Sequence, residues 1–244
     1  MFPFYGFGYG YGMNSWIFLI PAMIFALWAQ ARVKGSFSRY SRIRNHRNMT
    51  GAEAARRVLD ANGLRDVGIQ AVGGSLTDNY NPRTRVLSLS QDVYGASSVA
   101  AVSVACHEAG HAIQHARSYA PLRIRNAIVP VVNFASSFSW ILLILGLGLL
   151  FGGNGETTAM GNLIFNIGVG AFVAVVIFHL ITLPVEFDAS RRAIHQMDEL
   201  GIVDEAEKRG AKKVLSAAAL TYVAALAVAV AQLLRVLAIR GRRD

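Results

Sequence analysis

The sequence predicts a mainly α-helical membrane protein with three to four transmembrane helices and a small β-hairpin. Hydrophobic residues make up 53% of its 244 positions and charged residues only 16%, and the mean hydropathy is +0.37. Such a composition is too apolar for an ordinary soluble domain. Four stretches lack Asp, Glu, Lys and Arg, and each can hold the roughly 20 apolar residues that cross a bilayer: residues 1–31, 127–155, 157–185 and 214–234.

The positive charge is distributed as in a multi-pass membrane protein. The chain carries 24 Lys and Arg against 15 Asp and Glu, a formal net charge of +9. The basic residues lie in 32–125, 191–213 and 235–243, next to the apolar stretches. This placement follows the positive-inside rule. We therefore expect a lipid bilayer as the environment, a cytoplasmic location for residues 32–125 and 184–213, and no nucleic-acid partner.

The N-terminal segment, residues 1–31, combines a glycine- and aromatic-rich lead with a first transmembrane helix. The helix is expected to begin at Trp16 and to end near Ala31, where a run of basic residues follows. Lys and Arg directly after an apolar span anchor it on the cytoplasmic side.

Residues 32–126 are expected to form a cytoplasmic catalytic part. Thr50 and Glu53 match a capping box, which predicts a helix that begins there and ends at Asn62. Residues 69–90 alternate around several turn residues and predict a β-hairpin.

The hairpin turn is expected at Asn79–Arg83, and a long helix should follow from about Ser97 to Ala116. The hairpin is also a candidate edge strand for an extended peptide, although a purely structural hairpin is the plainer interpretation.

The remaining sequence predicts three further segments. Residues 127–185 should contain the second and third transmembrane helices, the latter ending near Pro184. Residues 186–213 should form a separate amphipathic helix and a charged connector, and residues 214–244 a fourth apolar helix with a basic tail. The fourth stretch either crosses the membrane, leaving the tail as an exception to the charge rule, or packs without crossing.

The most informative string is His-Glu-Ala-Gly-His at residues 107–111, an HExxH motif. Helix positions four apart share one face, so the imidazoles of His107 and His111 can reach one zinc ion at about 2.1 Å. Glu108 stands beside them, where it can take a proton from the water that the metal activates. A solvent-facing helix with scattered polar residues is the alternative, which the apolar flanks of the motif disfavour.

A catalytic zinc ion needs a third protein ligand and one open position. His115 cannot join both motif histidines on a continuous helix, because it lies about 12 Å along the axis from His107. Glu186 is the expected ligand, since it follows the third span on the same side of the membrane as the motif helix. Asp188 is the main rival, and it lies about 200° around the helix from Glu186. Cys106 is expected to be a small packing residue.

Several motifs together resemble a known family. The strings HEAGHAIQH, LPVEFDASRRA, TGAEAARRVLDANGL, LTDNYNPRTRVLSLS and KVLSAAALTYVAAL make the chain similar to the YugP-type neutral zinc metallopeptidases of bacterial membranes, over about residues 28–237. A more distant similarity to the HtpX-type membrane proteases covers the motif helix and E-x-x-A-x-R. The resemblance implies a gluzincin-like zinc-peptidase domain, Zn²⁺ as cofactor with Glu186 as third ligand, and an inner-membrane protein whose active site faces the cytoplasm.

The HtpX-type pattern also has an Asp four residues after the ligand Glu, where it supports a ligand histidine. Ser190 stands at that position here, so we expect a weaker hydrogen bond to an imidazole N–H. Hydrolysis further needs a donor for the developing oxyanion, and the sequence offers four candidates without decisive spacing: Tyr80, Tyr119, His179 and His195.

The expected function is that of a zinc-dependent metalloendopeptidase, a hydrolase of peptide or membrane-protein substrates in membrane-protein quality control or processing. One alternative is a non-catalytic zinc-binding membrane chaperone or adaptor, which has no need of Glu108. The other is a site-2-type intramembrane protease. Asp92, Arg117 and Arg123 lie close to the motif helix and disfavour it, because charges are costly inside the bilayer.

Overall fold

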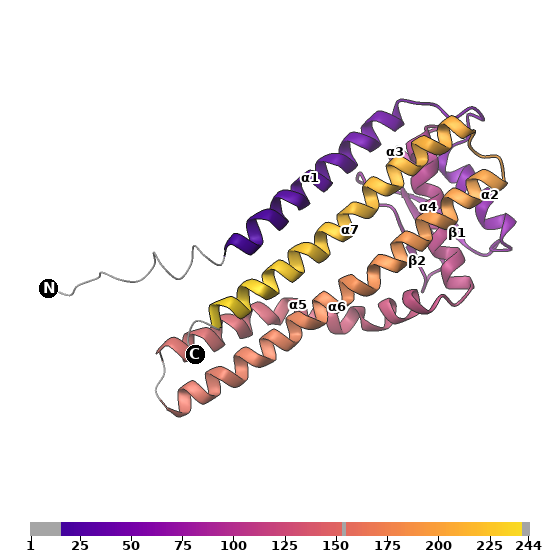
Figure 1. The fold of residues 1–244 in the computed structure, drawn as a ribbon. Coiled ribbons are helices and arrows are strands. Elements are labelled where there is room, and N and C mark those ends of the chain that lie inside the picture. The colour runs from indigo at the N-terminus through magenta and orange to yellow at the C-terminus, as the bar shows by residue number, and fades with distance from the viewer. Residues whose placement is uncertain (1–15, 153–154, 241–244) are drawn as a thin grey trace. The chain divides into compact units, whose positions relative to one another are not determined.

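The computed structural model describes residues 16–152 and 155–240, shown as coloured ribbon in Figure 1. The predicted N-terminal lead and the last basic residues lie outside this range. The described helices are α1 (Trp16–Ser41), α2 (Gly51–Ala61), α3 (Gln91–Tyr94), α4 (Val99–Ala116), α5 (Ala120–Gly152), α6 (Glu156–Glu199) and α7 (Glu205–Arg240). The strands are β1 (Gly68–Val72), β2 (Asn79–Asn81) and β3 (Val86–Ser90).

The predicted fold class is confirmed: the described chain is mostly helical, with one small sheet. Four of its helices, α1, α5, α6 and α7, are long and apolar enough to cross a membrane. Only 17–39% of the residues in their most apolar windows are buried, and large side chains such as Leu27, Phe134 and Ile144 are 64–67% exposed. Apolar surface on this scale is characteristic of helices that face lipid.

The chain divides into two compact units. One comprises the described residues within 1–28, 125–181 and 223–244, and the other comprises 29–124 and 182–222. In the first unit the buried side chains of Leu143, Leu150, Phe165 and Val236 form an apolar cluster. The second unit contains every residue of the candidate site described below.

Helix α6 corrects the expected break near Pro184. The helix runs without interruption from Glu156 to Glu199, so Pro184 lies inside it. Proline removes one backbone hydrogen bond and usually kinks or ends a helix. Here long helical segments on both sides of Pro184 continue the structure, because helix propagation is favourable once a nucleus exists.

The prediction that the charged residues 204–213 form a connector between helices is also wrong. Asp204 precedes α7, and its carboxylate accepts from the N–H of Glu207 at 2.8 Å. The Glu207 carboxylate accepts in return from the N–H of Asp204 at 3.0 Å. This reciprocal cap begins the helix at Glu205, so most of the charged segment is helical.

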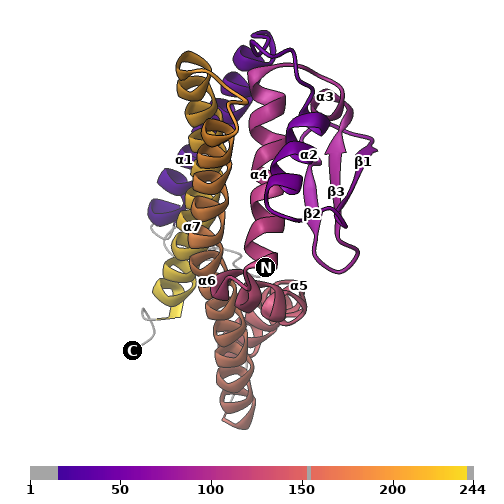
Figure 2. The same ribbon diagram turned by 90° about the vertical axis from the view of Figure 1, so that its right-hand side faces the viewer.

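The capping box of α2 is confirmed, with both hydrogen bonds between Thr50 and Glu53 present. Helix α2 and the three strands lie on the same side of α4 (Figure 2). Buried residues of α2, including Val58 and Leu59, belong to one core with Val102 and Cys106 of α4. This core supports the helix that carries the histidine motif.

The sheet corrects the predicted hairpin, because Asn79–Asn81, where the turn is expected, forms a third strand. Strands β2 and β3 are antiparallel and form the hairpin, with its turn after Asn81. Strand β1 pairs with β3 in parallel, which gives the order β1-β3-β2. Parallel pairing needs a connection of about a dozen residues, and residues 73–85 provide it. Strand β2 therefore forms one edge of the sheet.

Candidate metal centre

The two motif histidines lie on one face of α4. Ser98 caps the helix by accepting from the N–H of Ala101 at 3.1 Å, and the helix continues unbroken to Ala116. The ring centroids of His107 and His111 are 4.8 Å apart, with the ring planes at 82°. The two imidazoles are thus neighbours one helical turn apart, as the spacing predicts.

Glu186 of α6 meets both of these rings. Its Oε2 lies 3.3 Å from Nε2 of His107 and 3.5 Å from Nε2 of His111. The Glu186 side chain is 3% exposed. One carboxylate oxygen therefore lies within about a hydrogen-bond length of two imidazole nitrogens.

A close approach between the backbones of α4 and α6 allows Glu186 to contact the two histidines. A Cβ atom on Gly110 of α4 would lie only 2.7 Å from the carbonyl oxygen of Ala189 in α6. Real Cβ atoms do not come this close, so glycine is needed at position 110. Because Gly110 lies between the histidines in sequence and Ala189 follows Glu186 by three residues, this contact brings the three side chains together.

Glu108 is a second carboxylate beside the histidines. One of its oxygens and one nitrogen from each of His107 and His111 lie within 4.8 Å of one another. Glu108 is 9% exposed and lines a cavity of about 230 Å³ that His107 and Glu186 also line. Glu108 therefore has access to a molecule in this cavity.

The surroundings of His111 shift the pKa of its imidazole. Burial alone would lower the pKa of His111, but the hydrogen bond to Glu186 and the charges of Glu108 and Glu186 outweigh burial and raise it. Burial raises the pKa of the Cys106 thiol, so this cysteine stays protonated, in keeping with a packing residue.

The donor set fits zinc. Two imidazole nitrogens and a carboxylate oxygen are the ligands of the His₂Glu class of catalytic zinc sites, which leave one position open. Each histidine also has a partner at its other ring nitrogen, as zinc ligands almost always do. Ser190 Oγ lies 3.1 Å from Nδ1 of His107, and Gln114 Oε1 lies 3.0 Å from Nδ1 of His111.

The two rival ligands have other partners. His115 Nδ1 lies 2.9 Å from the Tyr80 hydroxyl. Asp188 accepts from Gln114 at 2.9 Å and from Arg192 at 2.5 Å, and it also pairs with Arg191. The structure thus brings Glu186 to the histidine pair and leaves these two residues outside it.

The cavity beside Glu108 is largely apolar. Its remaining lining consists mainly of small or aliphatic side chains, namely Val33, Leu76, Val104, Val214, Leu215, Ala218 and Ala219, with Asp78, Ser190, Thr221 and Tyr222 as polar members. Its lining includes none of the four predicted oxyanion donors. Sequence reasoning missed Tyr222, although a Thr-Tyr pair inside a charge-free stretch is a signal that could have found it.

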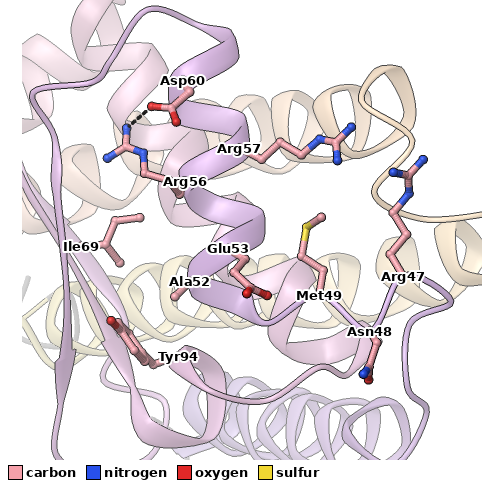
Figure 3. Close-up of a pocket in the computed structure, with 10 residues that line it drawn as sticks. All are labelled: Arg47, Asn48, Met49, Ala52, Glu53, Arg56, Arg57, Asp60, Ile69 and Tyr94. Carbon is pink, nitrogen blue, oxygen red and sulfur yellow. Dashed lines mark ion pairs between the residues drawn. The ribbon is translucent and has the colours of Figure 1, made fainter.

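A larger cavity of about 960 Å³ lies along α2 (Figure 3), where Arg56 pairs with Asp60 at 2.9 Å. Arg56 also donates to the carbonyls of Leu64 and Val67, and Arg57 donates to that of Leu200. These arginines tie chain segments together. The lining of this cavity contains no histidine.

Among the described residues, one further group could by proximity hold a metal ion: His46, Asp204 and Glu207. Glu207 already accepts from the ring and the N–H of His46 and from the N–H of Asp204. Its carboxylate therefore serves as part of the α7 cap.

Comparisons with known proteins identify the family of the chain. Residues 15–241 match the family model described as "Putative neutral zinc metallopeptidase". The chain is 50% identical over 220 residues to the "Putative membrane protease YugP" of Bacillus subtilis (strain 168), covering 90% of this chain and 93% of that protein. No solved structure matches the chain. On the family match and this identity, the chain belongs to the neutral zinc metallopeptidase family of YugP.

Proposed function

We propose that the protein is a zinc-dependent metalloendopeptidase in which His107, His111 and Glu186 hold the metal and Glu108 is the general base. The observation that supports it most is the position of Glu186 Oε2, 3.3 and 3.5 Å from the Nε2 atoms of two histidines in HExxH spacing. A scattered polar helix face would not gather a buried carboxylate from a distant helix, because burying a charge without partners is costly.

The reaction is the hydrolysis of a peptide bond by water. Zinc bound at this centre supplies Lewis-acid polarisation of the scissile carbonyl and lowers the pKa of the attacking water. Glu108 accepts the proton that water loses as its oxygen bonds to the carbonyl carbon. The same carboxyl group then gives the proton to the amine nitrogen as the C–N bond breaks. Tyr222 lines the cavity, and its hydroxyl is the proposed donor to the developing oxyanion.

The cavity and the sheet together favour an extended peptide with an apolar side chain. Leu76 and Asp78 line the same cavity as Glu108 and directly precede β2. Strand β2 lies at the edge of the sheet, and an edge strand can pair with an extended segment. A peptide paired along β2 would enter the cavity beside Glu108, where aliphatic residues can receive one of its side chains.

The proposed location is the bacterial inner membrane, as a multi-pass protein with the catalytic centre on the cytoplasmic side. The basic residues around α4 and after Pro184 support this orientation. The proposed substrates are cytoplasmic tails, loops or misfolded segments of membrane proteins, which suits a role in membrane-protein quality control or processing.

The test is to purify the full chain in detergent, measure bound zinc by mass spectrometry and map cleavage sites in unfolded membrane-protein tails. We expect about one zinc per chain, cleavage next to apolar residues, loss of cleavage on chelation and recovery with added zinc. Zinc without any cleavage would instead support a chaperone or adaptor. Cleavage confined to the interior of transmembrane helices would support an intramembrane protease.

A further inference from the structure

Next to His111 lies a fully buried amide, Gln114, one turn later on α4. Its Oε1 is 3.0 Å from Nδ1 of His111. Its Nε2 is 2.8 Å from the carbonyl oxygen of Val185 and 2.9 Å from Oδ2 of Asp188. The amide thus joins His111 to Asp188, a residue on α6.

These partners allow only one orientation of the amide. The Val185 carbonyl and the Asp188 carboxylate can only accept hydrogen bonds, so the NH₂ group of Gln114 must face them. Oε1 then faces His111, and an amide oxygen can only accept. The hydrogen of a neutral His111 ring must therefore be on Nδ1, which leaves the Nε2 lone pair directed toward Glu186.

The Asp188 carboxylate is itself held in place by further partners. Asp188 is 4% exposed, and it pairs with Arg191 and Arg192. An arginine side chain can only donate, so Asp188 accepts from both arginines and from Gln114. His107 is held differently, because the Ser190 hydroxyl can donate or accept and therefore does not select a tautomer.

We propose that Gln114 and Asp188 are positioning residues that hold His111 in the tautomer whose Nε2 can bind zinc. This inference rests on the proposed function, since it concerns the same metal. It also gives separate roles to the two carboxylates that the sequence offers as rival third ligands. Glu186 contacts the histidines directly, whereas Asp188 acts on His111 through Gln114.

The test compares Gln114→Met with Asn45→Leu in the full chain in detergent. Asn45 is a matched control, since it is also buried and its amide donates to the carbonyls of Met49 and Ser97 and accepts from the N–H of Met49. Zinc affinity is measured by competition with a chromophoric chelator, and metal geometry by the absorption spectrum of bound Co²⁺. We expect Gln114→Met to weaken zinc binding about 10- to 100-fold and to change the cobalt spectrum, while Asn45→Leu leaves both unchanged.

A second variant, Asp188→Asn, tests the connection between the two residues and remains informative if Gln114→Met does not fold. Asp188→Asn should weaken zinc binding in the wild-type background but have no further effect when combined with Gln114→Met, because it acts through the amide. Additive effects, or wild-type zinc affinity in Gln114→Met, would overturn the inference. A wild-type chain that binds no zinc would instead overturn the proposed function.

Discussion

Glu186 Oε2 lies 3.3 Å from Nε2 of His107, although 79 residues separate the two positions. Ser190, one helical turn after Glu186, lies 3.1 Å from Nδ1 of the same ring. A single turn of α6 therefore contacts both nitrogens of one imidazole. This arrangement restricts the ring's orientation and directs Nε2 toward the proposed metal position.

Glu108→Gln should separate metal binding from catalysis. The amide has nearly the same shape as the carboxylate but cannot accept the proton from water. We expect the variant to retain zinc and to lose peptide cleavage by about 10²–10⁴-fold. The measurements are zinc content and the cleavage rate of one defined peptide. Wild-type cleavage by a preparation free of contaminating protease would exclude Glu108 as the base.

Glu186→Gln should weaken zinc binding strongly, because it removes the charge of the proposed third ligand. The matched control is His115→Gln, which changes the third histidine of the motif helix. His115 contacts Tyr80, so this control should bind zinc with the affinity of the wild-type chain. Chelator competition measures both affinities. Equal losses in the two variants would mean that the ligand assignment is wrong.

Gly110→Ala should disturb the packing of α4 against α6. The added Cβ would lie 2.7 Å from the Ala189 carbonyl oxygen, and such overpacking costs about 1–3 kcal/mol. Zinc affinity should fall as well, since the contact lies between the histidines and Glu186. Gly95→Ala is the control, because no heavy atom lies within 4 Å of a Cβ there. Thermal unfolding measures the stability of the two variants, and chelator competition measures their zinc affinity. A Gly110→Ala chain that is as stable as Gly95→Ala would contradict the packing argument.

The orientation in the membrane can be tested with single cysteines in a Cys106→Ala background. Ser75, in the loop between β1 and β2, and Ala159, near the start of α6, are both exposed. We expect Ser75→Cys to react with a membrane-impermeant thiol reagent only after the inner membrane is opened. Ala159→Cys should react from the periplasmic side in intact spheroplasts. The reverse pattern would place the proposed centre outside the cytoplasm.

Local features were predicted well. The Thr50–Glu53 capping box and the helix that carries His107 and His111 depend on residues close together in the chain, and both are present in the structure. A hairpin is present as well, but its first strand is β2, which lies where the sequence predicts the turn. The direction in which β1 pairs with β3 was predicted wrongly: part of the expected turn forms β2, so the chain returns along β3 in parallel with β1. The break expected at Pro184 was wrong because the surrounding helix outweighs one lost hydrogen bond.

The sequence by itself determined that two imidazoles and a neighbouring carboxylate share one helix face, because spacing along a helix is a local property. It also determined the apolar helices, since their composition suffices. The sequence favours Glu186 and Ser190 as neighbours of the imidazoles, but only the tertiary structure decided that these two residues and Gln114 surround them. The physical reason is the close approach of Gly110 to Ala189, a contact between distant segments that depends on the packing of the whole unit.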